Sequence, residues 1–244
     1  MIDKIFAAML RHRHVVLVVG LLVAAVNAAA VGFAPTLGKR LFVPLLFLAM
    51  TLLLLAIIAM GIRPAYFVVR PQTPAFATPA PAWKVLFALG YLGSASAHIG
   101  AMVRWTRQGT ESTFDVVLGV PWLVLAALLV IEAWRGHGVQ LYPHGLRQSS
   151  PLGSLTVPWE ALPAPRIPPS ADRPYWLRMA FAEPQLVRRR GIPWSRKALR
   201  TDNVDAGFLA AVIRHYVSHP EHRAAIGSQA EYERLLAELP ERNG

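Results

Sequence analysis

Long apolar stretches, separated by short polar segments, fill the first half of the chain. Four such stretches can be delimited, at 15–33, 41–62, 85–103 and 116–134. Because a helix of about 20 apolar residues crosses the hydrocarbon core of a bilayer, the pattern predicts four transmembrane helices. The first two stretches contain no charged residue, whereas the third contains polar side chains and the fourth carries Glu132 near its end.

A proline-rich segment, residues 63–84, separates the second stretch from the third. Its prolines prevent a continuous helix, because proline lacks the amide hydrogen and its ring clashes with the preceding turn. We favour an ordered linker with no function of its own. The alternative is that 66–70 forms a short extended piece at the membrane surface and contacts the domain that follows.

From about Gly138 the pattern changes to short segments bounded by turns. Alternating apolar and polar residues are typical of half-buried strands, and glycine and proline between them mark tight turns. The predicted strands are 139–143, 146–150, 155–159, 174–181 and 185–192. Helices are then expected over 205–217, with Asp202, Asn203 and Asp205 as candidate N-caps, and over 229–239.

Composition supports a division of the chain into two kinds of domain. The chain is 54% hydrophobic and 16% charged, whereas soluble domains carry about 25% charged residues. Residues 1–134 contain four acidic and ten basic residues, and residues 135–244 contain ten acidic and fifteen basic residues. The expected fold class is a transmembrane α-helical domain over 1–135, a small soluble β-sandwich or barrel with a C-terminal helix over 136–226, and an amphipathic helix with a polar tail over 227–244.

Basic residues in the short loops predict the orientation, because lysine and arginine are enriched on the cytoplasmic side. With the N-terminus inside, the inner segments carry Lys4, Arg11, Arg13, Arg63, Arg70, Lys84 and Arg135. The outer segments carry Lys39, Arg40, Arg104 and Arg107. We therefore expect a multi-pass protein of the plasma (inner) membrane with both termini in the cytoplasm.

Two runs in the soluble half carry a family resemblance. GVQLYPHGLRQSSPLGSLTVPWEAL, residues 138–162, resembles the opening of bacterial pleckstrin-homology-like domains, where a strand, a glycine turn, a second strand and a V-P-W-E-x-I/L segment follow one another. FLAAVIRHYVSHPEHRAAIG, residues 208–227, resembles the ending of actinobacterial members. The resemblance covers about 136–226 and implies a pleckstrin-homology-like scaffold, with Trp159 in its core, in an actinobacterial multi-spanning membrane protein.

The residues that could carry catalysis or metal binding are few. The chain has no cysteine, which excludes disulfides, thiolate nucleophiles and cysteine-ligated metals. His215, His219 and His222 are spaced i, i+4 and i+7, and two histidines at i, i+4 on a helix can hold zinc. Because Pro220 interrupts the helix between the second and the third, we expect surface histidines, no metal site and no cofactor. No catalytic motif is evident, so we expect a protein without enzymatic activity.

Polar residues inside the predicted spans form a second set of candidates. Tyr91, Ser94 and His98 share one helix face in the third span, and Asn27 of the first span is a candidate partner. Ionisable groups inside a membrane often mark a proton or substrate path. The favoured interpretation is helix packing, since small residues and interhelical hydrogen bonds are typical of membrane helix interfaces.

The densest basic stretch lies in the soluble half. Its candidate lipid- or partner-binding residues are Arg188, Arg190, Arg196, Lys197 and Arg200. On a strand, Arg188 and Arg190 share one face and Arg189 points to the other. Anionic headgroups attract such residues, whereas the alternative is a solvated edge strand. No nucleic-acid motif is present.

These patterns favour a membrane-anchored scaffold or regulatory protein without enzymatic activity. Its expected partners are membrane lipids and either a membrane protein or further copies of the same chain, and no nucleic acid is expected. The alternative is a small transporter or channel-like subunit that uses the polar face of the third span.

Overall fold

Separate stretches of the chain combine into two units. In the computed structural model, Met1–Gly61 joins Pro81–Gly136, and Ile62–Ala80 joins His137–Gly244. We call these the helical unit and the sheet unit. The structure describes residues 9–10, 12–109, 113–136, 138–150, 153–163, 175–191 and 198–239.

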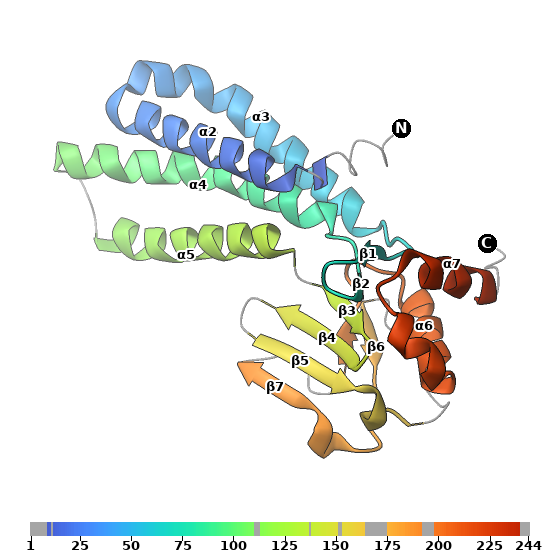
Figure 1. Ribbon diagram of the computed structural model, residues 1–244. Helices are drawn as coiled ribbons and strands as arrows, with labels where there is room; N and C mark the ends of the chain where they lie inside the picture. The colour runs from blue at the N-terminus through green and yellow to red at the C-terminus, as the bar shows by residue number, and fades with distance from the viewer. Residues whose placement is uncertain are drawn as a thin grey trace. The chain divides into compact units, whose positions relative to one another are not determined.

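Four long helices form the helical unit, and α4 packs against each of the other three (Figure 1). They are α2 (Arg13–Phe33), α3 (Pro35–Met60), α4 (Ala82–Gln108) and α5 (Thr113–Arg135). Within the described residues, α2, α3 and α4 are long and apolar enough to cross a membrane. Only Ala34 separates α2 from α3, so the second helix begins six residues before the predicted 41–62 span.

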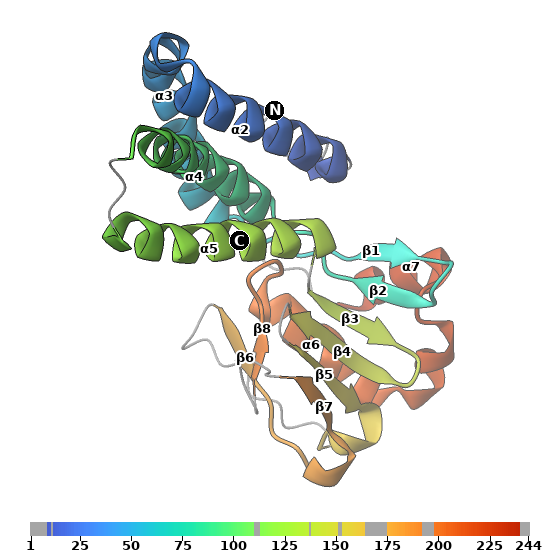
Figure 2. The same ribbon diagram turned by 90° about the vertical axis from the view of Figure 1, so that its left-hand side faces the viewer.

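Two antiparallel sheets form the sheet unit (Figure 2). The strands are β1 (Val68–Arg70), β2 (Ala75–Ala77), β3 (Val139–Tyr142), β4 (Gly145–Ser150), β5 (Gly153–Pro158), β6 (Trp176–Arg178), β7 (Arg188–Gly191) and β8 (Ala198–Arg200). The larger sheet has the order β1-β2-β3-β4-β5-β7, and β6 pairs with β8. A membrane-type helical part and a small antiparallel sheet domain were the expected combination, and the structure has both.

The segment between α3 and α4 belongs to the sheet unit, so the interpretation as an inert linker is wrong. Its strand β2 pairs with β3, with Phe76 opposite Leu141. Phe76 is fully buried, and the amide of Phe67 donates to the Tyr232 hydroxyl at 3.0 Å. The proline-rich sequence stops a helix but still supplies strand residues and buried aromatic rings to a distant part of the chain.

Most predicted strands are present, but their lengths differ. The β3–β4 hairpin is confirmed, but its turn lies at Pro143 and His144 and not at the predicted residues 144–145, because Gly145 pairs with Tyr142. Predicted strand 174–181 is reduced to Trp176–Arg178, and 185–192 to Arg188–Gly191 after a 3-10 turn at Pro184–Leu186. Strand β8 was not predicted, because three residues give too short a pattern to recognise.

Helices α6 (Ala206–Ser218) and α7 (Gln229–Glu238) close the core of the sheet unit, with the 3-10 helix η3 (Pro220–Ala225) between them. The predicted cap at Asp205 is confirmed, because its side chain accepts from the amide of Phe208 at 2.7 Å. Trp159 and Leu235 are both buried in one hydrophobic cluster. The predicted boundary at 226 is therefore wrong, since α7 packs into the same core as the strands.

Candidate functional site

One face of the larger sheet, which we call the outer face, carries arginine on two separate strands. The register places Arg147 of β4 opposite Thr156 of β5, and Thr156 opposite Arg188 of β7. Neighbouring strands lie about 4.8 Å apart, so the Cα atoms of Arg147 and Arg188 are about 10 Å apart, with β5 between them. Arg190 lies two residues beyond Arg188 and shares its face, opposite Ser154.

The opposite face of the same strands is buried against the helices. Leu146 and Val157 form one inward-facing row, and both are fully buried beneath α6. Arg189 pairs with Leu155 on this inner side of the sheet. Thus the alternation places Arg188 and Arg190 outward and Arg189 inward, as the sequence pattern predicts for a strand.

The outer-face arginines are exposed and lack acidic neighbours. Arg147, Arg188 and Arg190 are exposed, and no described carboxylate forms an ion pair with any of them. None of the eight strands contains an acidic residue. The acidic residues of the described sheet unit lie in turns, at caps and in the helical segments, so acidic residues are separated from the strands.

The other predicted basic residues do not extend this face. Arg196 and Lys197 lie outside the described residues. Arg200 lies on β8 in the smaller sheet, where it forms an ion pair with Asp202 and its guanidinium lies 5.8 Å from the ring centre of Trp176. Arg147 was missed by sequence reasoning, although its outward position follows from the alternation within 146–150.

Inside the helical unit, Asn27 and Ser96 form a buried polar pair. The Asn27 amide nitrogen donates to Ser96 Oγ at 2.8 Å, and Ser96 Oγ donates to the Gly93 carbonyl at 2.8 Å. The Asn27 carbonyl oxygen is buried without a hydrogen-bond partner among the described residues. Asn27 therefore joins α2 to α4 through Ser96 and not through the predicted Tyr91–Ser94–His98 face.

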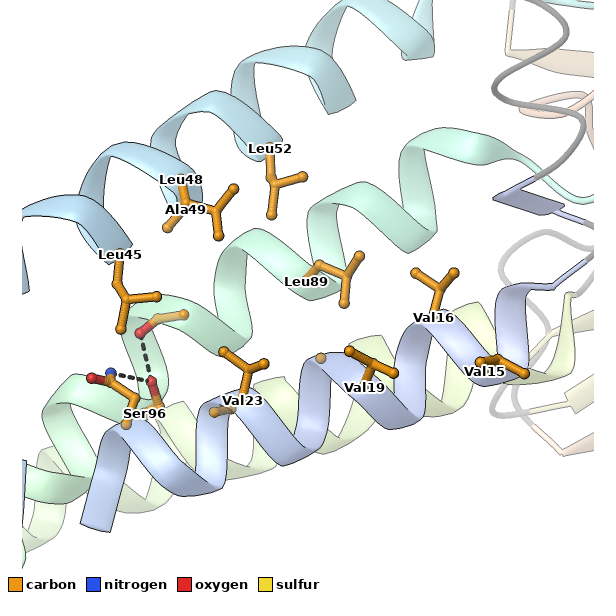
Figure 3. A pocket seen from close by; sticks show the side chains of 14 residues that line it. Val15, Val16, Val19, Val23, Leu45, Leu48, Ala49, Leu52, Leu89 and Ser96 are labelled. Atoms are coloured by element: carbon orange, nitrogen blue, oxygen red, sulfur yellow. Dashed lines mark hydrogen bonds between the residues drawn. The ribbon is translucent and has the colours of Figure 1, made fainter. Parts of the chain in front are cut away.

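An apolar hollow of about 330 Å³ lies next to this pair (Figure 3). Valines of α2, leucines of α3 and Leu89 of α4 line it, and Ser96 lies at one end. Its walls are almost entirely hydrocarbon, which matches the surroundings of a membrane-spanning helix.

The other predicted polar residues of α4 face a different helix. Tyr91 stacks on Trp122 of α5 with ring centres 5.0 Å apart, and the His98 ring lies 6.1 Å from that of Trp122. His98 Nε2 is buried with no hydrogen-bond partner in the described part of the chain. Ser94 is half-buried. Ser94 and Ser96 point in different directions, because residues two apart on a helix are rotated by about 200° about its axis.

A buried ion pair at the other end of the unit was not anticipated. Lys84 Nζ lies 2.5 Å from Glu132 Oε1, with the side chains 8% and 20% exposed. Helices α4 and α5 run in opposite directions, which brings the start of α4 beside the end of α5 and pairs these two charges.

Comparisons of the chain with protein-family models, with curated proteins and with solved structures found no match.

Proposed function

We propose that this is a membrane-anchored scaffold or regulatory protein without enzymatic activity, whose sheet unit binds anionic lipid headgroups through Arg147, Arg188 and Arg190. The observation that carries the proposal is the segregation of charge on the outer face. Three exposed arginines share a face formed by acid-free strands. Each basic residue near an anionic membrane surface contributes about 1 kcal/mol of attraction, and arginine forms bidentate hydrogen bonds with phosphate.

Chain connectivity supports a four-span arrangement in this proposal. Strand β2 follows α3 and precedes α4, whereas its partner β3 follows α5. Because β2 and β3 pair in one sheet, the ends of α3 and α5 lie on the same side of the membrane. The chain from β2 to β3 passes through α4 and then α5. If α4 crosses the bilayer, α5 therefore crosses it in the opposite direction and returns the chain to the side of β2.

The charge pattern supports a cytoplasmic location for that side. On that side, Arg63, Arg70, Lys84 and Arg135 lie close to the ends of the membrane helices, where lysine and arginine are enriched on the cytoplasmic side. Two antiparallel sheets followed by α6 are consistent with the pleckstrin-homology-like architecture suggested by the sequence. We propose that architecture as the scaffold that presents the outer face.

Lipid binding has better support than the transport alternative. A transport path requires polar groups that follow one another across the bilayer. Asn27 and Ser96 lie between α2 and α4, whereas Tyr91 and His98 face Trp122 of α5. These four residues therefore do not share one path, and we propose helix packing as their role.

Vesicle flotation of the full chain tests the proposal. The isolated 137–244 segment is unsuitable, because it lacks β1 and β2 and the buried ring of Phe76. The protein would be placed in phosphatidylcholine nanodiscs and mixed with vesicles containing phosphatidylglycerol or phosphatidylcholine alone. We expect flotation with the anionic vesicles, weakened by high salt because exposed charges are screened.

A matched pair of double variants makes this test specific. The double variant Arg188→Gln with Arg190→Gln should weaken binding to the anionic vesicles about thirtyfold, because each arginine contributes about 1 kcal/mol. Arg178→Gln with Arg189→Gln removes the same charge from strand positions off the outer face and should have a much smaller effect. Equal losses in the two variants, or equal flotation with both vesicle types, would exclude this face as a lipid site and favour a protein partner.

A further inference from the structure

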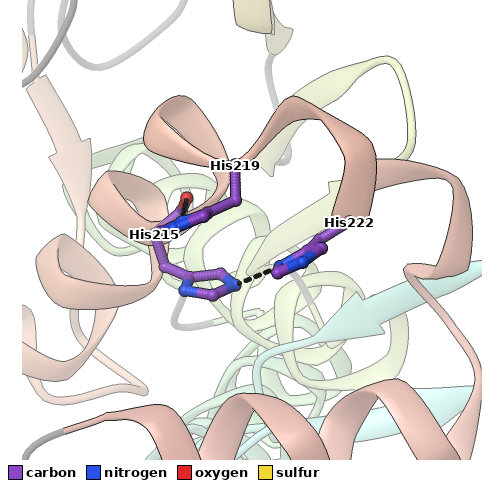
Figure 4. A group of neighbouring side chains, drawn as sticks. All are labelled: His215, His219 and His222. Atoms are coloured by element: carbon purple, nitrogen blue, oxygen red, sulfur yellow. Dashed lines mark hydrogen bonds between the residues drawn. The ribbon is translucent and has the colours of Figure 1, made fainter.

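Three histidines that are separated by a proline in the sequence come together in the structure. His215 lies in the last turn of α6, His219 caps its end, and His222 lies in η3 (Figure 4). One ring nitrogen from each lies within 4.8 Å of the others. Pro220, which argued against a cluster at the sequence level, begins the turn that brings His222 back beside His215.

The spacing of the first pair matches two ligands of one metal ion. His215 Nε2 and His222 Nδ1 are joined by a hydrogen bond of 3.2 Å (Figure 4), whose proton a metal ion would replace. Two nitrogens bound to tetrahedral zinc at about 2.0–2.1 Å are about 3.3–3.4 Å apart. A ring nitrogen of His219 lies within 4.8 Å of the other two ligand atoms, so metal binding requires a small shift of this exposed side chain.

Of the remaining ring nitrogens, one donates a hydrogen bond to a backbone carbonyl and two lie within ion-pair distance of a carboxylate. His219 Nδ1 donates to the backbone carbonyl of His215 at 3.0 Å, which leaves its Nε2 free as a ligand. His215 Nδ1 lies 3.5 Å from Glu238, and His222 Nε2 lies 3.7 Å from Glu221. Histidines that bind metals almost always direct their second nitrogen to a carboxylate, a backbone carbonyl or water.

The surrounding contacts hold the three elements in place. Arg223 Nε donates to the Tyr216 carbonyl at 2.7 Å, which fixes η3 against the end of α6. The Tyr216 hydroxyl donates to Glu231 at 2.9 Å and joins α6 to α7, the helix that carries Glu238.

We propose that His215, His219 and His222 bind one divalent transition-metal ion, of which zinc fits best. The ligand atoms are His215 Nε2, His219 Nε2 and His222 Nδ1, with Glu238 and Glu221 orienting two of the rings. Neutral imidazoles suit zinc better than magnesium or calcium, which prefer oxygen ligands. Three protein ligands leave one position for water, and the ion links α6 to η3.

Calorimetric titration of the full chain with zinc chloride tests this site. The detergent-solubilised protein would be purified through a histidine-free tag and treated with a chelator. We expect one zinc ion per chain, and His219→Gln and His222→Gln should each weaken binding at least about tenfold. His144→Gln, in the β3–β4 turn of the same unit, is the matched control and should bind zinc like the unmodified protein.

X-ray absorption of the zinc-loaded full chain gives an independent readout that requires no variant. We expect three imidazole ligands at about 2.0–2.1 Å and one oxygen ligand. A shell of oxygen ligands alone, no stoichiometric binding, or unchanged affinity in both His219→Gln and His222→Gln would overturn the proposal. Because His219 is exposed, its substitution should leave the fold intact, which circular dichroism would verify.

Discussion

The two units of the chain bury opposite kinds of residue. In the helical unit, the buried positions are mainly small, such as Ala56, Gly90 and Ala95, and large residues such as Phe47 are exposed. In the sheet unit, the largest buried side chains include Trp159, Tyr216 and Phe76. One chain therefore contains two units that bury different kinds of side chain.

The difference is the one expected when hydrocarbon surrounds the helical unit and water surrounds the sheet unit. Hydrocarbon solvates large apolar side chains as well as a protein core does, so membrane helices associate through small residues that allow close backbone approach. Water does not solvate them, and the hydrophobic effect drives large side chains into the core of the sheet unit. The exposed valines and leucines of α2 and α3 thus support a membrane environment independently of helix length.

Truncating a buried aromatic residue of the sheet unit should have the largest effect. Phe76→Ala leaves a cavity between Leu141 and Tyr232 and should lower the free energy of unfolding of that unit by about 3–5 kcal/mol. Hydrogen exchange of β3–β5 peptides in the detergent-solubilised protein would measure it.

Phe47→Ala is the matched control in the helical unit. Phe47 is 70% exposed, so its removal leaves no cavity and should change stability by about 0.5 kcal/mol or less. If Phe47→Ala destabilised the protein as much as Phe76→Ala, the contrast between the two units would be wrong.

Breaking the buried ion pair of the helical unit should have the next largest effect. Glu132→Ala leaves Lys84, which is 8% exposed, without its carboxylate partner. Loss of one member of a buried pair costs about 3–5 kcal/mol, and we expect about 2–3 kcal/mol because Glu132 is one-fifth exposed. Thermal inactivation in detergent, compared with the exposed control Arg135→Ala, would measure the loss.

The double variant Lys84→Met with Glu132→Leu separates charge pairing from packing. Replacing both charges by apolar side chains of similar size is often neutral, so most of the lost stability should return. A double variant that is as unstable as Glu132→Ala would show that the charges themselves are required at this position.

Local pattern predicted much of the fold, because period and turn chemistry are local properties. The β3–β4 hairpin and the cap at Asp205 follow from neighbouring residues alone. The pairing of β2 with β3 joins residues separated by a complete helical hairpin, and no local signal encodes it. The proline-rich segment therefore looked like a linker although Phe76 is fully buried.

The candidate sites also contain parts that the local sequence pattern predicts and parts that it does not. Alternation along one strand correctly separated Arg188 and Arg190 from Arg189, but only the register across β5 adds Arg147 to their face. For the histidines, Pro220 favoured separate surface residues, whereas the turn at Pro220 places His222 beside His215. Sequence identifies residues that share one element, whereas sites built from several elements require the tertiary structure.

Adding a single methyl group where α2 and α4 are in contact should have the smallest effect on stability of the three kinds of substitution. The Cβ of Gly100→Ala would lie 2.6 Å from the Ala28 carbonyl oxygen and 2.6 Å from Val31 Cβ, so the two backbones must separate. Overpacking of this kind costs about 1–3 kcal/mol, and hydrogen exchange in α2 and α4 should rise while exchange in the sheet unit stays unchanged. Gly61→Ala is the control, because its nearest neighbour lies at 3.4 Å and its backbone is already helical. Equal exchange in the two variants would mean that close backbone approach does not hold the helical unit together, and small buried residues would then need another explanation.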